Sequence, residues 1–473
     1  MRSAIGVAAG AMAALVAGCG ASDASAPLAG GADAGPRIDD ATWGADGYYR
    51  DDAGRAVLLR GVNVAHSSKR SADGLPWVQP SDFATLRADW GANLIRLTVF
   101  WRFVEPTRGS YDAAYVAAVR ERLDWAEAAG ISVLLDMHQD LYGFEATDES
   151  EGDGPPAWAR DATCAPFADK SPWFTNYFEE PVDCQFRSFW ADTNGVQTAF
   201  VAMWEHLLGA VGDHPALVGV DLWNEPWVPK TATAAGVLAP FYERIMPRVR
   251  AAAPRMVVFY EPGTLSGQGQ DQAPPRPAYD RVVFAPHFYP PAIWLGAPYR
   301  GGLGDQRPQL EQQIAQAKDA RVPLVVGEWG AQRDGVGYDA YVGDLLHAWQ
   351  DAWVGSARWS YDRDSYRFAL LAADGTAPAS STAMIEPYAE RVPGTPLGST
   401  LSASEKRLTV RFQSSEAADA WITCPSRFCA AEPRLTATLD GAPVQVAGTW
   451  DAARARLSVA CTAAGRYELS LGW

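Results

Sequence analysis

Two short segments of this chain each carry a glutamate directly after or within an apolar run of strand length, where a buried strand has no need of a charged side chain. Gly219–Pro226 reads Gly-Val-Asp-Leu-Trp-Asn-Glu-Pro, and Leu324–Gly330 reads Leu-Val-Val-Gly-Glu-Trp-Gly. A charge after an apolar strand must be solvated, paired or functional. Two such carboxylates, Glu225 and Glu328, are what cleavage of a glycosidic bond requires, because one protonates the leaving oxygen while the other attacks the anomeric carbon or activates water. Either glutamate alone would more simply be a salt-bridged residue at the rim of a sheet.

Alternating strand-like and helix-like stretches would hold these two residues. Helical patterns such as Asp112–Ala129 and Gln309–Ala320 separate apolar runs that suit parallel strands buried on both faces. Eight such units predict a (β/α)₈ barrel over residues 38–392, with functional side chains at the carboxyl ends of the strands. The expected strands are Val57–Val62, Asn93–Phe100, Ile131–Met137, Leu217–Trp223, Met256–Glu261, Arg281–Pro286, Val322–Gly327 and Ala357–Tyr361. The polar residues at or near their ends are Asn63, Arg96, His138, Glu225, Glu261, His287, Glu328 and Trp359.

The composition narrows the class of protein. The 473 residues suffice for one large and one smaller domain, and the formal net charge of −16 argues against nucleic-acid binding. The 19 Trp residues suit both a core and a sugar-stacking groove. The chain contains no Cys-x-x-Cys, no His-Glu-x-x-His and no Gly-x-Ser-x-Gly, so we expect no zinc site, no cofactor and no serine esterase.

The N-terminus has the form of an export signal. A short apolar run from Ala4 to Val16 is followed by Val-Ala-Gly and then Cys19, as in bacterial lipoproteins. We expect residues 1–18 to be removed, Cys19 to be lipidated and residues 19–37 to form a flexible tether. Ordinary signal-peptide cleavage is the alternative. Either route predicts an exported protein, which is a lipoprotein of the bacterial cell envelope or a secreted protein, and we expect a monomer.

Two further regions stand out from the barrel pattern. The stretch between the third and fourth expected strands, Asp140 to Asn194, is too long for an ordinary loop, and its aromatic content predicts a groove wall or lid. Because export permits disulfides, we expect Cys164 and Cys184 to pair within it. Residues 393–473 alternate apolar and polar side chains between turn signals, which predicts a small antiparallel β-sandwich. It holds Cys424, Cys429 and Cys461, from which one pair and one free thiol are expected.

The chain resembles clan A, family 5 glycoside hydrolases. Their signatures are Asn-Glu-Pro after the fourth strand and Glu-Trp/Phe-Gly after the seventh, which stand here as Asn224–Pro226 and Glu328–Gly330. Within the family it resembles the endoglycoceramidase branch, which also carries a terminal β-domain. The segments that suggest this branch are Leu59–Asn63, Ser67–Lys69, Trp101–Pro106, Leu134–Asp140 and Ala285–Pro290.

The resemblance implies roles for the residues of the two signatures and their neighbours. Glu225 would be the general acid/base and Glu328 the nucleophile, with Arg96 pairing the nucleophile and Tyr289 donating to it. Asn224 would hydrogen-bond the sugar 2-hydroxyl. A lone Arg96 could otherwise be an ion-paired rim residue.

The remaining roles concern the sugar. His138 and His287 would line the floor of the site, although isolated histidines are more often satisfied core residues. Trp359 would be the stacking platform under the sugar being cleaved. Lys69 and Asp140 would hold the adjacent glucose, and Lys69 could instead be a solvated loop charge. The resemblance places a further sugar-contacting ring at Trp190.

These observations predict a retaining endo-β-glycosidase that cleaves between a glycan and a lipid aglycone such as ceramide, by double displacement. Phe144–Asn176 and Gly267–Arg276, the loops that would set aglycone and glycan specificity, depart from the branch. The expected apolar trough draws on Trp227, Pro290, Pro291, Ile293, Trp294 and Leu295. The alternatives are a family 5 β-glucanase or β-glucosidase acting on polysaccharide or steryl glucoside, and a non-catalytic glycan-binding protein.

Overall fold

Eight parallel strands form the centre of the molecule. The computed structural model describes residues 43–146, 153–363 and 367–473. The strand order is β7-β6-β5-β4-β3-β2-β9-β8, and parallel bridges from Phe284 to Leu324 and from Phe288 to Trp329 join the outer two strands. This closed sheet confirms the predicted barrel. Its strands are β2 (Arg60–Val64), β3 (Leu94–Val99), β4 (Ser132–Met137), β5 (Leu217–Asp221), β6 (Val258–Tyr260), β7 (Val282–Phe284), β8 (Val325–Trp329) and β9 (Gly355–Arg358).

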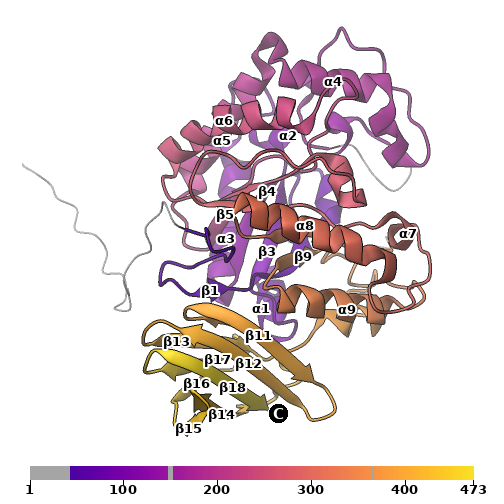
Figure 1. Cartoon of the computed structure of the whole chain (residues 1–473). Helices are drawn as coiled ribbons and strands as arrows, with labels where there is room; N and C mark the ends of the chain where they lie inside the picture. The colour runs from indigo at the N-terminus through magenta and orange to yellow at the C-terminus, as the bar shows by residue number, and fades with distance from the viewer. Residues whose placement is uncertain (1–42, 147–152, 364–366) are drawn as a thin grey trace, which may run out of the picture.

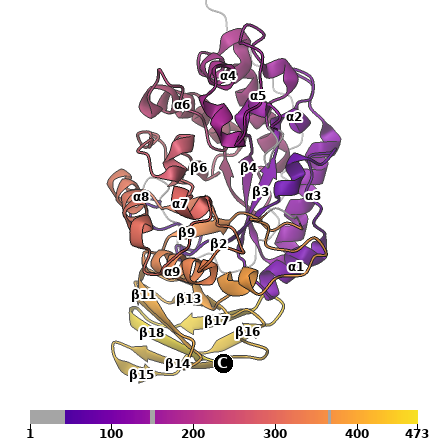
Figure 2. The ribbon, with the colours of Figure 1, turned by 90° about the vertical axis from the view of Figure 1, so that its right-hand side faces the viewer.

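Helices surround the barrel (Figures 1 and 2). They are α1 (Pro80–Ala88), α2 (Trp101–Val104), α3 (Ala113–Ala129), α4 (Glu180–Trp190), α5 (Val196–Val211), α6 (Ala234–Ala252), α7 (Pro291–Trp294), α8 (Arg307–Ala320) and α9 (Tyr338–Asp351). The α3 helix shows why they begin and end where they do, because Asp112 accepts the N–H groups of Ala114 and Tyr115 and Gly130 ends the helix in the left-handed region. Within the described residues, no helix is long and apolar enough to cross a membrane.

The alternation of side chains along the strands places the polar residues. On β3, Ile95, Leu97 and Val99 belong to the large apolar cluster that includes the helices. Leu94 belongs instead to a separate cluster made mainly of residues from the other strands. Arg96 has the same parity as Leu94, so its side chain points into the barrel, where it is fully buried.

Residues 388–473, together with Ala56–Val57, form an antiparallel sandwich of two five-stranded sheets. In β12, Leu408, Val410 and Phe412 are buried and alternate with more exposed residues. They lie opposite apolar residues of β18 and form the sandwich core. One sheet has the order β1 (Ala56–Val57), β10 (Tyr388–Val392), β13 (Ala418–Thr423), β17 (Arg456–Cys461) and β16 (Gly448–Asp451). The other has the order β11 (Thr395–Ser402), β12 (Arg407–Ser414), β18 (Gly465–Gly472), β14 (Arg434–Leu439) and β15 (Ala442–Val444).

One expected barrel strand is divided between the two folds. Val57–Val62 was predicted as one strand, but β1 pairs with β10 of the sandwich and the barrel strand β2 begins only at Arg60. The Leu58 N–H donates to the carbonyl of Glu390, so this backbone is used by the sandwich before the chain turns into the barrel. An apolar run buried on all sides does not reveal which of two sheets it joins.

Buried ion pairs cross the contact between barrel and sandwich. Arg87 of α1 lies 2.6 Å from Glu390 of β10, and Thr423 of β13 donates to the same carboxylate. Arg60 of β2 pairs with Glu386 at 2.8 Å. Charges this deeply buried must be paired. The barrel and the sandwich therefore each supply a partner that the other needs at this contact.

Candidate active site

A cavity of about 290 Å³ lies at the carboxyl ends of the barrel strands. Its lining combines polar side chains, called here the polar wall, with apolar side chains, called here the apolar wall. The polar wall includes Lys69, His138, Asp140, Asn224, Glu225 and Glu328. The apolar wall includes Trp173, Phe174, Tyr177, Phe178, Leu265, Pro291, Trp294, Leu295 and Phe368.

Glu225 and Glu328 meet in the polar part. Glu328 lies within β8, and Glu225 follows the end of β5. A carboxylate oxygen of each and a ring nitrogen of His287 all lie within 4.8 Å of one another. The two glutamates therefore face a shared space from strands that are far apart in the chain.

Glu328 is held as a carboxylate. Arg96 donates from Nη1 to Oε1 at 2.6 Å, and the Tyr289 hydroxyl donates to Oε2 at 3.0 Å. Burial alone would raise the pKa of Glu328, but the charges of His287 and Arg96 outweigh it and hold the pKa below its usual value. An ionised carboxylate with fixed donors is suited to act as a nucleophile.

Glu225 has the opposite environment. Burial raises the pKa of this carboxyl, and the negative charges of Glu328 and Asp140 raise it further, while contact with His287 opposes the shift without cancelling it. His287 Nδ1 lies 2.7 Å from Glu225 Oε1. A carboxyl group with a raised pKa beside one with a lowered pKa is the pairing that general acid catalysis needs.

The backbone of Glu225 is also unusual. Its φ of +42° lies in the left-handed region, which costs a non-glycine residue about 1–3 kcal/mol. Its carbonyl accepts from Thr264 at 2.6 Å and from Gln139 at 3.1 Å, and its N–H donates to Glu261 at 3.0 Å. These three bonds fix the direction in which the side chain leaves the strand end.

Arg96 is the central cation of the barrel mouth. Its side chain is fully buried and its pKa stays well above the usual value, because surrounding carboxylates outweigh the effect of burial. Besides Glu328, its partners are Asp136 at 3.0 Å, Asp221 at 2.8 Å, Asn224 at 2.9 Å, Glu261 at 3.1 Å and Asn63 at 3.1 Å. The structure thus places Arg96 inside the site rather than at the rim.

A second group of charged side chains lies beside Arg96. Lys69 pairs with Asp140 and lies 4.9 Å from the centre of the Trp359 ring. His138 stacks on Trp359 with ring centres 5.2 Å apart and contacts Asp136 at 2.7 Å. Burial would lower the pKa of His138, but Asp136 outweighs it and raises the pKa to about 10. Lys69 is therefore a buried member of the site and not a solvated loop charge.

Clusters of carboxylates and imidazoles in this region come close enough to hold a metal ion. Arg96 and Lys69 already pair with these carboxylates. The positive charge that a metal would bring is therefore supplied by side chains.

Trp190 is not brought to the cavity. Helix α4 turns its ring toward Phe189 and Phe241, with ring centres 5.0 and 5.6 Å away, and its N–H donates to the Trp227 carbonyl at 3.0 Å. The position expected from the resemblance therefore corresponds to a packing residue. Of the expected trough, Pro291, Trp294 and Leu295 line the cavity.

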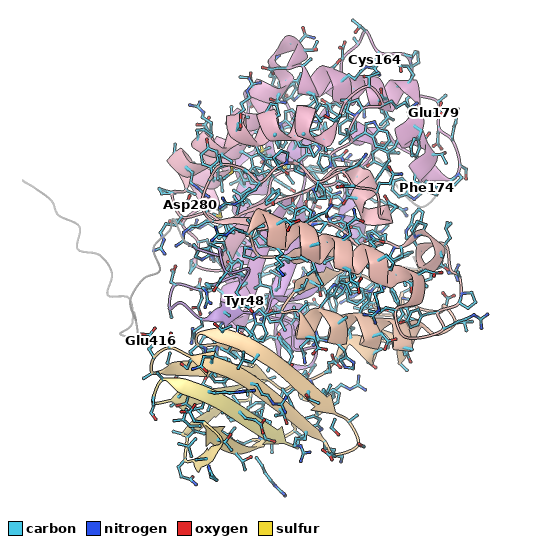
Figure 3. All side chains as sticks on the ribbon, in the orientation of Figure 1. Tyr48, Cys164, Phe174, Glu179, Asp280 and Glu416 are labelled. Atoms are coloured by element: carbon cyan, nitrogen blue, oxygen red, sulfur yellow. A yellow bond between two sulfur atoms is a disulfide. The ribbon has the colours of Figure 1, made fainter. Side chains whose placement is uncertain are left out.

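The aromatic insertion supplies the rest of the apolar wall. The four aromatic residues of the 3₁₀ helix Trp173–Phe178 line the cavity, and the ring of Phe174 lies 4.9 Å from that of Trp294. Figure 3 shows Phe174 at the edge of this segment, on the side toward α7. The sequence indicated a groove wall here, but the lack of a regular pattern hid which rings would face inward.

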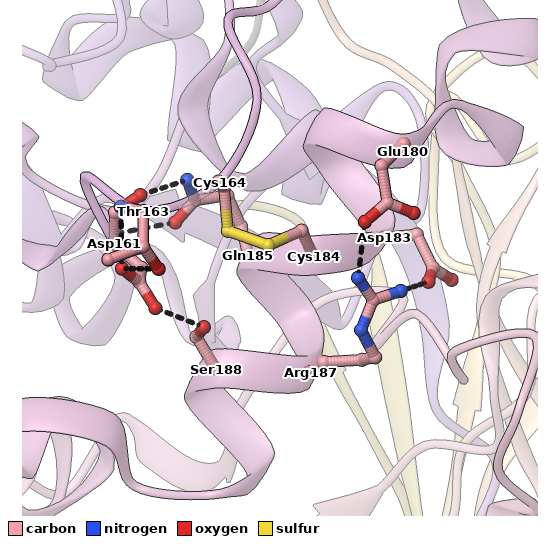
Figure 4. Close-up of a disulfide and its surroundings, with 9 residues drawn as sticks. All are labelled: Asp161, Thr163, Cys164, Glu180, Asp183, Cys184, Gln185, Arg187 and Ser188. Carbon is pink, nitrogen blue, oxygen red and sulfur yellow. Dashed lines mark hydrogen bonds and ion pairs between the residues drawn. A yellow bond between two sulfur atoms is a disulfide. The ribbon is translucent and has the colours of Figure 1, made fainter.

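The insertion is braced by a disulfide (Figure 4). Cys164 and Cys184 are joined, as expected, and Asp161 accepts from Ser188 and Thr163 next to the bond. In the sandwich, Cys424 pairs with Cys429 and Cys461 is a buried free thiol. The export signal, Cys19 and the tether lie outside the described residues.

Comparison with known proteins places the chain. Residues 51–365 match the cellulase family, glycosyl hydrolase family 5. The chain belongs to this family. Similar proteins include Endoglycoceramidase I of Rhodococcus hoagii, 31% identical over 320 residues, and an endoglycoceramidase of Cyanea nozakii, 27% identical over 281 residues. These alignments span 60% and 51% of this chain and 62% and 55% of the two relatives.

Solved structures are similar over more of the chain. Endo-glycoceramidase II from Rhodococcus sp., solved as a ganglioside GM3 complex, has a TM-score of 0.79 and 27% identity and covers 90% of this chain and 99% of its own. The same enzyme has been solved as a lactosyl-enzyme intermediate, with a TM-score of 0.75, 27% identity and the same coverage.

Proposed function

We propose that this family 5 protein is a retaining endo-β-glycosidase that hydrolyses the bond between a glycan and a lipid aglycone such as ceramide. One observation carries the proposal: two carboxyl groups with opposite electrostatic environments lie within 4.8 Å of each other in a cavity lined by both polar and apolar side chains.

The chemistry follows from the two environments. Protonated Glu225 gives its proton to the glycosidic oxygen, while Glu328 attacks the anomeric carbon from the opposite face. Glu225, now ionised, then removes a proton from the water that releases the glycan from Glu328. Retaining enzymes hold their carboxyl groups about 5–5.5 Å apart, whereas inverting enzymes need about 6.5–9.5 Å. The lactosyl-enzyme form of the Rhodococcus enzyme supports the covalent route.

The polar wall suits a sugar. Trp359 offers a flat apolar face, and Lys69 with Asp140 offers a donor and an acceptor beside it. Asn224, whose oxygen is occupied by Arg96 at 2.9 Å, reaches the same space and would contact the hydroxyl next to the reacting carbon.

The apolar wall suits a hydrocarbon chain. Phe178 is 44% exposed and Leu295 is 66% exposed, and both line the cavity. Exposed apolar side chains that continue into an apolar cavity mark a binding surface rather than ordinary packing. The GM3 complex of the Rhodococcus enzyme supports a glycolipid as substrate.

A substrate panel tests the proposal. We expect lactosylceramide and a ganglioside to be cleaved to an intact glycan and ceramide. Hydrolysis of cellopentaose without cleavage of either glycolipid would favour a β-glucanase, and binding without turnover would favour a glycan-binding protein.

A matched pair of variants tests the aglycone wall separately. Leu295→Ser should lower kcat/KM for lactosylceramide about tenfold, because burying a leucine contributes about 1.5–3 kcal/mol, but it should leave an aryl lactoside unaffected. Leu397→Ser removes a leucine that is 45% exposed on β11 of the sandwich, and it should change neither substrate.

We also propose that the protein is exported and anchored through lipidated Cys19. The short apolar run before Cys19 supports this. Mass spectrometry of membrane fractions should find a diacylated Cys19 at the mature N-terminus. A mature chain that begins downstream of Cys19 would exclude the anchor.

A further inference from the structure

Glu261 closes a ring of contacts around the acid/base carboxyl. His287 Nδ1 lies 2.7 Å from Glu225 Oε1, and its other ring nitrogen lies 3.3 Å from Glu261 Oε1. The second oxygen of Glu261 accepts the backbone N–H of Glu225 at 3.0 Å. Glu261 therefore contacts both the main chain of Glu225 and the imidazole that touches its side chain.

Glu261 is itself held firmly. It is 2% exposed, Arg96 lies 3.1 Å from Oε1, and its backbone N–H donates to the Tyr242 hydroxyl at 2.8 Å. Burial would raise its pKa, but His287 and Arg96 outweigh burial and keep the pKa below its usual value. Its neighbour Asp221 shares a hydrogen bond with it, and burial and the charge of Glu261 raise the pKa of Asp221 well above its usual value.

The charge on His287 depends on its surroundings. Three carboxyl groups face the ring: Glu225 after β5, Glu261 after β6 and Glu328 in β8. Burial would lower the pKa of His287, but Glu261, followed by Glu328, raises it well above its usual value. The imidazolium in turn lowers the pKa of both Glu225 and Glu328.

We propose that Glu261 is a positioning residue that fixes the strained main chain of Glu225 and keeps His287 charged, and so sets the pH range in which the two glutamates work. The part concerning catalysis rests on the proposed function. Glu261 does not line the cavity, so it acts through Glu225 and His287 rather than on substrate.

Glu261→Gln tests the charge. Without this carboxylate the pKa of His287 should fall, so that Glu225 and Glu328 lose part of the positive charge that lowers their pKa values. Both limbs of the pH profile of kcat/KM should then move upward by about one unit. A uniform loss of activity with both limbs in place would overturn the proposal.

Two further variants separate charge from shape. Glu261→Asp keeps the charge but shortens the side chain, so it should lower kcat and leave the limbs where they are. Asp221→Asn imitates a protonated Asp221 and should also leave them in place. If Glu261→Asp moves the limbs as far as Glu261→Gln does, the charge of Glu261 is not the cause and the proposal is wrong.

A measurement on the unaltered protein depends neither on the folding of a variant nor on turnover of a substrate. Nitrogen NMR of labelled histidine, with the signal assigned through His287→Asn, should show a doubly protonated His287 at pH 7. A neutral ring at that pH would refute the proposal even if glycolipid hydrolysis is found. A charged ring together with inactivity on every substrate would leave the role of Glu261 in holding His287 intact and reject the proposed function alone.

Discussion

Removing the Tyr289 hydroxyl should move the acid limb of the pH profile of kcat/KM. The hydroxyl donates to Glu328 Oε2 at 3.0 Å, while Arg96 holds the other oxygen. A hydrogen bond to a charged group contributes about 1.5–3 kcal/mol, and one pKa unit corresponds to about 1.36 kcal/mol. In Tyr289→Phe the pKa of Glu328 should therefore rise by about 1–2 units.

The sign of the pH effect follows from the role of Glu328. The bond favours the ionised form, and the nucleophile must be ionised, so its loss moves the acid limb of kcat/KM to higher pH. The alkaline limb, which reports Glu225, should move much less. Profiles measured with an aryl β-lactoside provide the test.

Tyr361→Phe is the matched control for this variant. It removes another tyrosine-to-carboxylate bond, 3.3 Å long and made with Asp82, at a residue that does not line the cavity. An acid limb that stays in place in Tyr289→Phe, or that moves equally in Tyr361→Phe, would refute the reasoning.

Four other predictions concern the mechanism and the stability of the fold. Glu328→Gln should lower kcat by several orders of magnitude because no nucleophile remains. Glu225→Ala should slow the hydrolysis of substrates with poor leaving groups far more than that of substrates with activated ones, and with added azide it should yield a β-glycosyl azide detectable by NMR. An α-configured first product would contradict both. Cys164→Ser should destabilise the insertion by about 3 kcal/mol in a simple loop-entropy description, seen as faster proteolysis between residues 160 and 190; an unchanged rate would show that packing alone holds it. Arg87→Ala should cost about 3–5 kcal/mol, measured by denaturant unfolding at pH 7. Burial would raise the pKa of Glu390, but Arg87 and Arg391 hold it at about 2. The stabilisation by the Arg87–Glu390 ion pair is therefore present above about pH 4.5 and is lost as the pH falls toward 2. If Arg87→Ala lowers the free energy of unfolding equally at every pH, packing and not charge is responsible.

The sequence predicted the residues that lie at or near the ends of strands and carry distinctive neighbours. Asn224-Glu225-Pro226 and Glu328-Trp329-Gly330 are short and local, and the barrel brings their carboxylates together. His287 and Tyr289 follow the same rule, because parallel strands direct their ends to one face. Arg96 instead reaches the site from within β3, with its side chain inside the barrel.

The parts that could not be predicted depend on side-chain direction within irregular or helical segments. Trp190 faces the core because of the turn of α4, which composition does not reveal. The rings between Trp173 and Phe178 face the cavity from a 3₁₀ helix with no apolar period to recognise. Glu261 was visible as a polar strand end, but its contacts with Glu225 and His287 arise only when three loops are packed.

The pairing of β1 with β10 also has a consequence for the order of events during synthesis. Arg50, just before β1, donates to the carbonyl of Gly394, 344 residues later in the chain. At roughly 5–20 residues per second, the early segment waits about 20–70 s for this partner to be made. Meanwhile β2, which follows β1 directly, has no β9 beside it. During synthesis, the barrel strand β2 and the sandwich strand β1 therefore both lack a neighbouring strand. Their partners, β9 and β10, are made only in the last quarter of the chain.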